Sequence, residues 1–294
     1  MTQALAVEQM PLSRSLAMDL HHRVETYRDL GTFQTHLARL LAQGRSLGDC
    51  VQLTEALGII EPFTHRHIPP DGVQILGSNY RETLMANDLL SRNRGELCVL
   101  EKAYGSLEAL ASLDIYLVEY FTGFAAWMRQ HADADRLTLS EFLEGIEANF
   151  DDVVHQDLCA LTYADQAFDL VLCNELFEHV YDLGQAFHEI ARVLRAGGRL
   201  LATCPMAFGQ KEHIVKAQRN RETGELELFG VAETHGDPLR PEEGSLVYQI
   251  PGWAMLDELR AAGFSDVMLH HVTSWKHGVL GSDLPGVLVL EAIR

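Results

Sequence analysis

The sequence predicts an α/β protein with a doubly wound, mostly parallel sheet and an N-terminal helical appendage. Three observations support this prediction. Apolar runs and helix-like segments alternate from about residue 96 onward, which is typical of parallel sheets with right-handed crossovers. Most of these apolar runs end in an acid. In the N-terminal region, by contrast, the apolar residues recur at the spacing of a helix. We therefore expect a helical and loop region at 1–95 and an α/β domain at 96–294.

The first region is expected to be helical up to about residue 60. Its apolar residues recur at intervals of three and four, and Gly31, Gly44 and Gly58 interrupt the pattern. The following segment, 61–95, is rich in turn-forming pairs such as Pro69-Pro70 and Asp71-Gly72. The simplest interpretation is an appendage that packs on the main domain or on a second subunit, so a homodimer remains open.

The second region is expected to supply the sheet. Helices are predicted between the strands at 122–132, 141–150 and 179–198, and a polar insertion is predicted at 206–246. A helix at 251–264 and two strands are expected to close the domain. The last helix before the insertion is expected to end at Gly197-Gly198. The five predicted parallel strands lie at 114–119, 136–141, 151–157, 168–175 and 198–205.

The charge and cysteine content of the chain argue against several classes of partner and cellular compartment. The chain has 23 basic and 42 acidic residues, a formal net charge of −19, which disfavours nucleic acid and anionic membrane surfaces. Five scattered cysteines without a CxxC pair favour a reducing compartment. Because neither a signal-peptide pattern nor a long apolar run is found, we expect a cytoplasmic protein.

Polar residues follow the predicted strands at Glu119, Glu141, Asp157 and Asn174-Glu175. Ligands of open parallel sheets bind at the carboxyl ends of the strands. Glu141 follows Glu119 by 22 positions, the spacing of a carboxylate that accepts from both hydroxyls of a ribose. The alternative is that these acids cap the helices that follow them.

The segment 157–205 carries a recognisable pattern. It contains an acid at Asp157, the turn Asp165–Asp169, then Phe177-Glu178-His179-Val180, the run 192–198 and Pro205. In this order the residues resemble the second half of class I S-adenosylmethionine-dependent methyltransferases of the methyltransferase-11-like type. The resemblance implies a Rossmann-like methyltransferase fold and S-adenosyl-L-methionine as the cofactor.

The resemblance also implies residue roles. Glu119 would lie near the methionine part of the cofactor, Glu141 at its ribose with Phe142 beside the adenine, and Asp157 and Leu158 along the adenine. The family's first turn has three glycines, whereas this chain has Phe121, Gly123 and Ala125 at these positions. The resemblance implies these cofactor-binding residues: Glu119, Thr122, Gly123, Glu141, Phe142, Asp157, Leu158, Asn174 and Glu175.

Candidate catalytic residues are His179, His235 and Asp237. A neutral His179 could accept a proton from the methyl acceptor, and His235 with Asp237 could supply a base and its orienting carboxylate. The alternative is packing for His179 and a hydrogen-bonded turn for His235–Pro238. Tyr80 and Arg81 are candidate substrate residues in a loop before the sheet, with a surface turn as the alternative. No metal ion is expected.

These features lead to one main hypothesis and two alternatives. The main one is an enzyme that transfers a methyl group from S-adenosylmethionine to a small-molecule O, N or C acceptor, as in small-molecule biosynthesis. The glycine-poor first turn leaves open an inactive binding or regulatory protein on the same fold. A dehydrogenase is disfavoured because no GxGxxG follows the first strand.

Overall fold

The structure is a computed structural model that describes residues 18–146, 150, 152–220 and 223–294. Two compact units make up the chain. The first contains Met1–Tyr27, Gly31–Leu107 and His270–Val289, and the second contains Arg28–Leu30, Glu108–Leu269 and Leu290–Arg294. The predicted boundary between residues 95 and 96 lies inside a helix of the first unit, Ser91–Tyr104.

The first unit confirms the N-terminal helical part, and adds short strands to it. A small core gathers Leu20, Leu47, Cys50, Leu84 and Leu280. The elements are β1 (Arg23–Tyr27), α2 (Leu30–Gln43), η1 (Gly44–Ser46), α3 (Leu47–Leu57), β2 (Ile59–Ile60), β3 (His67–Ile68), η2 (Pro70–Gly72), β4 (Val73–Ile75), α4 (Tyr80–Thr83), β5 (Leu84–Ala86), β6 (Leu89–Leu90) and α5 (Ser91–Tyr104).

Gly58 shows why the second predicted helix stops where it does. This residue caps α3 with a φ of +71°, a conformation that glycine adopts without steric cost. A Cβ at this position would lie 2.1 Å from the carbonyl oxygen of Ile68. The glycine therefore both ends α3 and lets β3 pass close to the chain.

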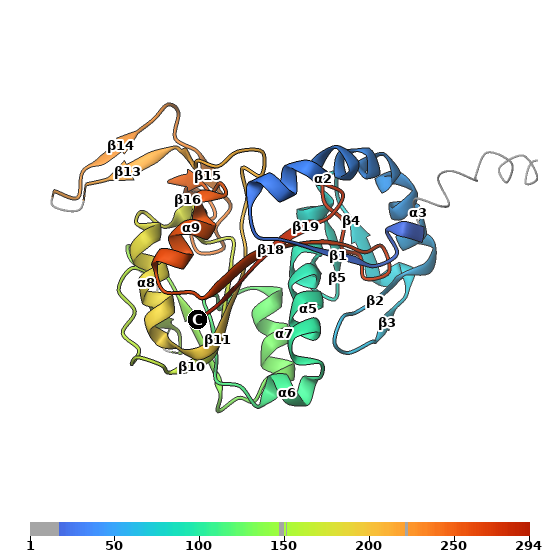
Figure 1. The fold of residues 1–294 in the computed structure, drawn as a ribbon. Helices are drawn as coiled ribbons and strands as arrows, with labels where there is room; N and C mark the ends of the chain where they lie inside the picture. The colour runs from blue at the N-terminus through green and yellow to red at the C-terminus, as the bar shows by residue number, and fades with distance from the viewer. Residues whose placement is uncertain (1–17, 147–149, 151, 221–222) are drawn as a thin grey trace, which may run out of the picture. The chain divides into compact units, whose positions relative to one another are not determined.

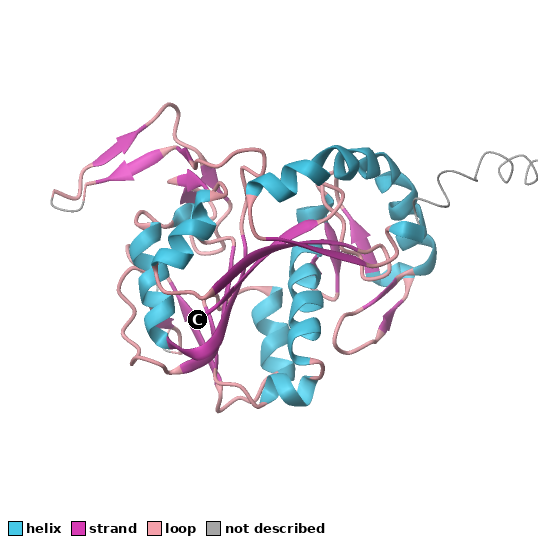
Figure 2. Cartoon of the chain, in the orientation of Figure 1, coloured by secondary structure: helices cyan, strands magenta, loops and turns pink. Residues whose placement is uncertain are grey.

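Strands of the second unit form most of an eight-stranded sheet (Figure 1, Figure 2). The strand order is β1-β18-β19-β11-β10-β7-β8-β9. The pairs β9–β8, β8–β7, β7–β10 and β10–β11 are parallel, and β11–β19 is antiparallel. The strand bounds are β7 (Ile115–Leu117), β8 (Leu137–Glu141), β9 (Val154–His155), β10 (Phe168–Asn174), β11 (Leu194–Thr203), β18 (Asp266–Thr273) and β19 (Val287–Ile293).

This order confirms the predicted doubly wound, mostly parallel sheet. From β7 the chain moves outward through β8 to β9, and then returns to the other side of β7 with β10 and β11. The direction of winding reverses between β7 and β10. Beyond the carboxyl ends of strands at such a reversal, neighbouring loops part and leave room for a ligand.

Three helices of this unit follow the predicted positions: α7 (Gly123–His131), α8 (Leu183–Val193) and α9 (Ala254–Ala261). Side-chain oxygens cap two of them, since Thr122 accepts from the Ala125 amide and Asp182 accepts from the Gln185 amide. One face of α8 is buried, with Phe187 and Ile190 fully enclosed. Burial of each such side chain stabilises the fold by about 2 kcal/mol. Helices α8 and α9 lie side by side (Figure 1).

Two local predictions were wrong. A helix was expected at 141–150, but Glu141 ends β8 and the described residues 142–146 and 150 are not helical, while 147–149 lie outside the described residues. The helix before β11 was expected to end at Gly197-Gly198. It ends at Val193 instead, because Leu194 is extended and already pairs with Phe168.

The predicted insertion contains small antiparallel ladders rather than a further layer of the sheet. Its pairs are β12–β17, β13–β14 and β15–β16. The strand bounds are β12 (Ile214–Val215), β13 (Ala217–Arg219), β14 (Leu226–Leu228), β15 (Thr234–His235), β16 (Ser245–Leu246) and β17 (Gln249–Ile250). In the part of the chain that the structure describes, no helix is both long and apolar enough to cross a bilayer.

Candidate functional site

The polar residues that were predicted to form a rim lie at one edge of the sheet. Glu119 lies two residues beyond β7, Glu141 ends β8, Asp157 lies two residues beyond β9, and Asn174 ends β10. Since these four strands are mutually parallel, their carboxyl ends share this edge.

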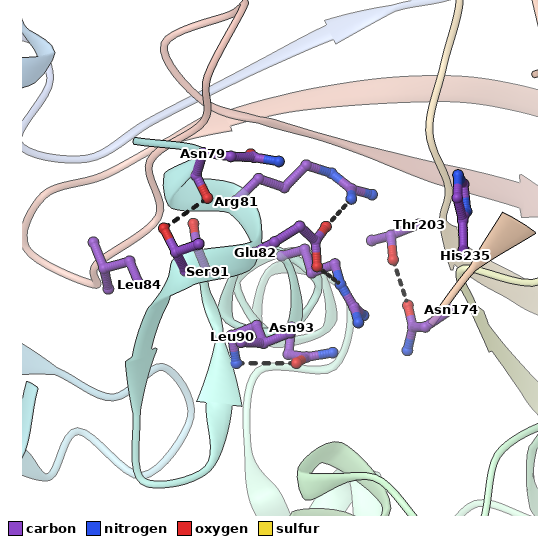
Figure 3. A network of polar contacts seen from close by, with 12 residues as sticks. Asn79, Arg81, Glu82, Leu84, Leu90, Ser91, Asn93, Asn174, Thr203 and His235 are labelled. Atoms are coloured by element: carbon purple, nitrogen blue, oxygen red, sulfur yellow. Dashed lines mark hydrogen bonds and ion pairs between the residues drawn. The ribbon is translucent and has the colours of Figure 1, made fainter. Parts of the chain in front are cut away.

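Glu119 and Asn174 belong to a buried hydrogen-bonded chain. The Asn174 Nδ2 donates to Glu119 Oε1 at 2.9 Å. The Thr203 hydroxyl donates to Asn174 Oδ1 at 2.9 Å (Figure 3). All three side chains are buried. The chain connects the ends of β7, β10 and β11, and it fixes the orientation of the Asn174 amide because both of its ends have a partner.

Glu141 points its carboxylate back toward the first turn. Its Oε2 accepts from the Tyr120 amide at 3.3 Å, and its Oε1 accepts from the Phe142 amide at 3.2 Å. Both bonds are long, and each carboxylate oxygen can accept another hydrogen bond. Burial raises the pKa of Glu141, and the nearby carboxylates of Asp237 and Glu119 add to this effect.

The glycine-poor first turn has an aromatic lining. The Phe121 ring lies 5.0 Å from the Tyr120 ring and 5.1 Å from the Phe150 ring. The Arg129 guanidinium lies 4.2 Å above the Tyr120 ring, and it also donates to the Tyr120 carbonyl. Thr122 caps α7 and Gly123 is its first residue, so this turn holds a helix N-terminus beside the rim.

The adenine side of the predicted site contains Phe142, Asp157 and Leu158. The Phe142 ring is 38% exposed and lies 5.5 Å from the His155 ring. Asp157 accepts from the Cys159 amide through Oδ1, and Leu158 is buried. The exposed ring can therefore stack on a planar ligand, while the Asp157 carboxylate holds its own loop.

Residues 102–202 match the family model described as "Methyltransferase domain". This range runs from the end of α5 to the end of β11 and contains every rim residue named above. The match identifies residues 102–202 as a methyltransferase domain. The resemblance seen in the sequence, and the fold that it implied, are confirmed.

The individual proteins and solved structures that resemble this chain align with different shares of its length. The uncharacterized protein YafE of Escherichia coli (strain K12) is 40% identical over 50 residues, which are 17% of this chain and 24% of that protein. A methyltransferase from Mesorhizobium loti is 17% identical, with 64% of this chain and 95% of that chain covered and a TM-score of 0.40. The 1,6-didemethyltoxoflavin-N1-methyltransferase of Burkholderia thailandensis is 15% identical, with 69% and 78% covered and a TM-score of 0.39.

Beyond β10 lies a cluster of one acid and two histidines. Glu178 and His179 lie on the short helix η3 (Phe177–His179), and His235 lies on β15. The two imidazole rings meet edge to face at 5.2 Å. His179 Nδ1 lies 2.8 Å from the Leu246 carbonyl, so Nδ1 carries the proton and Nε2 keeps its lone pair.

The predicted catalytic pair His235–Asp237 is arranged differently from the expectation. His235 faces two other carboxylates, Glu178 at 3.5 Å and Glu233 at 3.7 Å, and Glu178 raises the pKa of His235. Asp237 accepts from Leu239, Arg240 and Ser245. These bonds lower the pKa of Asp237 although burial alone would raise it. A catalytic role for Asp237 stays a prediction, and the bonds match the alternative of a stabilised turn.

The predicted substrate residues Tyr80 and Arg81 lie on α4 of the first unit. Tyr80 packs against the core around Leu84. Arg81 pairs with Glu82, whose other oxygen accepts from Arg92 Nε at 2.9 Å (Figure 3). Their role toward a substrate remains a prediction.

Two residues of this region were missed in the sequence. Thr203 is a buried polar residue at the end of an apolar strand, a signal that could have been read from "LLAT". Glu178 was named only as part of the 177–180 motif, yet it is a fully buried acid. Acids are seldom fully buried unless a partner compensates their charge, so this residue is informative once its burial is known.

Proposed function

We propose that this chain binds S-adenosylmethionine along the rim and transfers its methyl group to a small-molecule acceptor. The observation that carries the proposal is the placement of four polar side chains, Glu119, Glu141, Asp157 and Asn174, at adjacent carboxyl ends beside the reversal in strand order. Together with the domain match, this placement supports a cofactor site rather than separate helix caps.

The proposed binding mode assigns one part of the cofactor to each side chain. Glu141 accepts from the two ribose hydroxyls, which its two carboxylate oxygens suit. The exposed Phe142 ring stacks near the adenine, and Asp157 accepts from the exocyclic amine. Glu119, held by Asn174, lies toward the methionine ammonium, where a carboxylate offsets a positive charge.

In the proposed reaction, the acceptor atom attacks the methyl carbon in line with the carbon–sulfur bond. That bond breaks with its electron pair going to sulfur, which becomes an uncharged thioether. An O–H or N–H acceptor releases its proton to a base, for which we propose the Nε2 atom of His179. Alignment and exclusion of water would supply most of the rate.

A small-molecule acceptor is favoured by charge. The net charge of −19 and the acidic rim oppose a polyanionic substrate such as RNA. The acceptor class can be tested by incubating the full chain with S-adenosylmethionine carrying a labelled methyl group and fractionated cell extract. Label in the small-molecule fraction supports the proposal, and label confined to RNA or protein contradicts it.

Cofactor binding is tested separately by titration calorimetry with S-adenosylmethionine and S-adenosylhomocysteine. Binding of both is expected. If neither produces heat at millimolar concentration, the chain is a binding or regulatory protein on a methyltransferase fold, which is the alternative raised by the aromatic first turn.

A further inference from the structure

The carboxylate of Glu178 lacks the partners that a buried acid requires. Its side chain is 1% exposed, and among the described residues neither carboxylate oxygen has a hydrogen-bond partner. An ionised carboxylate in such surroundings costs several kcal/mol unless a charge or several donors compensate. Two imidazole nitrogens, His235 Nδ1 and His179 Nε2, lie 3.5 and 3.7 Å from Glu178 Oε1, beyond ordinary hydrogen-bond length.

The three side chains point their potential ligand atoms at one another. His235 Nδ1 and His179 Nε2 both face Glu178 Oε1, and one ligand atom from each residue lies within 4.8 Å of the others. Ligands placed about 2.1 Å from a tetrahedral ion lie about 3.4 Å from each other. The separations from Glu178 Oε1 to the two imidazole nitrogens, 3.5 and 3.7 Å, are close to this value, and the two nitrogens lie within 4.8 Å of each other.

The far side of each imidazole has the partner that metal-bound histidines commonly use. His179 donates from Nδ1 to the Leu246 carbonyl, which leaves Nε2 as the ligand atom. On His235, Nε2 lies 3.7 Å from Glu233 Oε1, which is too long for a hydrogen bond but places a carboxylate on that side of the ring, and Nδ1 is the atom that faces Glu178. The other oxygen of Glu233 pairs with Lys216 at 2.9 Å, which holds that carboxylate in place.

The backbone around the cluster is anchored as well. The Tyr248 amide donates to the Glu178 carbonyl at 2.8 Å, which ties η3 to the insertion. His235 pairs with Ser245 across the β15–β16 ladder, so its position follows from the same segment. Ligands from two chain segments are thus brought together by backbone contacts that do not depend on an ion.

We propose that Glu178, His179 and His235 bind a divalent transition-metal ion, with Zn²⁺ as the best match to two imidazoles and one carboxylate. Three protein ligands leave a coordination position for water or for an oxygen or nitrogen atom of a small molecule. The site differs from our expectation of no metal. A bound ion would occupy Nε2 of His179, so His179 can act as the proposed base only in the metal-free protein, whereas cofactor binding at the rim does not require the ion.

The test uses the full chain after removal of metals with a chelator and dialysis. Zn²⁺ is titrated calorimetrically into the wild type, Glu178→Gln, His235→Asn and His188→Asn. His188 is an exposed histidine on α8 and serves as the control for adventitious surface binding. The wild type and His188→Asn are expected to bind alike, and Zn²⁺ should bind the other two variants at least about 100-fold more weakly.

A second cluster, His22, Cys98 and His277, could also bind Zn²⁺, so Cys98→Ser is included. Binding retained in Cys98→Ser assigns the ion to the Glu178 cluster, whereas binding lost only in Cys98→Ser overturns the proposal. Substitution with Co²⁺ gives an independent readout, because the visible bands of a site without thiolate should disappear in His235→Asn.

The proposal is wrong if the wild type binds no Zn²⁺, or if Glu178→Gln and His235→Asn bind it as tightly as the wild type. Should Glu178→Gln fail to fold by circular dichroism, His235→Asn decides, since its side chain is 34% exposed and replaceable. Titration of the metal-free wild type with S-adenosylmethionine separates the two proposals, because cofactor binding at the rim is expected without the ion.

Discussion

The carboxylates of Glu141, at the rim, and of Asp237, in the insertion near it, differ in how much of their hydrogen-bonding capacity the protein already uses. Asp237 accepts three bonds and holds a turn, whereas Glu141 accepts two long backbone bonds and retains capacity on both oxygens. Two carboxylates that look equivalent in the sequence therefore have different roles in the structure. Glu141 is the acid best prepared to accept from a ligand.

Replacing Glu141 with alanine is expected to weaken S-adenosylmethionine binding about 100-fold, because two charge-assisted hydrogen bonds to the ribose are lost. Titration calorimetry measures the effect. The exposed neighbour Glu144 supplies the matched control, since Glu144→Ala removes the same charge from the same loop. Equal affinities for the two variants would show that the ribose lies elsewhere.

Arg94 shows how one buried charge can hold several chain segments. Its guanidinium is fully enclosed and donates to the carbonyl oxygens of Leu84, Leu89, His277 and Gly278. Lysine has fewer donors in a different geometry and cannot replace the planar fork. Arg94→Lys is expected to lower the free energy of unfolding by about 3 kcal/mol.

Urea unfolding measures the Arg94 effect. The exposed Arg45 is the control, and Arg45→Lys should change stability by less than about 0.5 kcal/mol. A loss for Arg94→Lys as small as that of the control would mean that water or a neighbouring group satisfies the four carbonyls.

At the level of elements, the first turn combines a helix cap with an aromatic contact. Thr122 caps α7 through the Ala125 amide at 3.0 Å, and the neighbouring Phe121 ring packs on Tyr120 and Phe150. The family's glycines let a backbone approach its ligand closely. In this chain the first turn has one glycine, and the Thr122 cap and the Phe121 ring contacts fix its conformation.

Thr122→Ala is therefore expected to destabilise the protein by about 1 kcal/mol, since one helix-terminal amide loses its acceptor. Thr122→Ser keeps the oxygen and should retain most of the stability. Thermal unfolding of the three proteins checks this order. If the alanine and serine variants unfold together, the cap bond does not contribute and the methyl group of Thr122 matters instead.

For the whole molecule, the parallel sheet could be predicted because burial on both faces leaves long apolar runs in the sequence. The N-terminal helices and the rim acids Glu119 and Glu141 could be found by spacing alone. The helix expected at 141–150 was wrong for its described residues, because apolar spacing in so short a segment does not distinguish a helix from a loop. The Glu178 cluster could not be predicted, since His235 joins it through contacts between segments far apart in sequence.

The final prediction concerns the response of the whole fold to acid. His271 lies on β18, is buried, and accepts from the Gly286 amide through Nε2, which requires a neutral ring. Burial lowers the pKa of His271 to about 4. The carboxylate of Glu25 opposes this shift in part, and the positive charges of Arg39 and Arg23 add to it slightly. In the unfolded chain the pKa is 6.5.

Because the pKa is lower in the folded state, the stabilising contribution is complete above pH 6.5 and is lost as the pH falls from 6.5 through about 4. The free energy of unfolding should fall by up to about 1 kcal/mol per pH unit in this range on account of His271. His271→Gln keeps an acceptor but does not titrate, so urea unfolding between pH 4 and 7 should show a shallower slope for this variant. Identical slopes for both proteins would mean that His271 takes up its proton without unfolding, and that the buried ring has a partner for the charge.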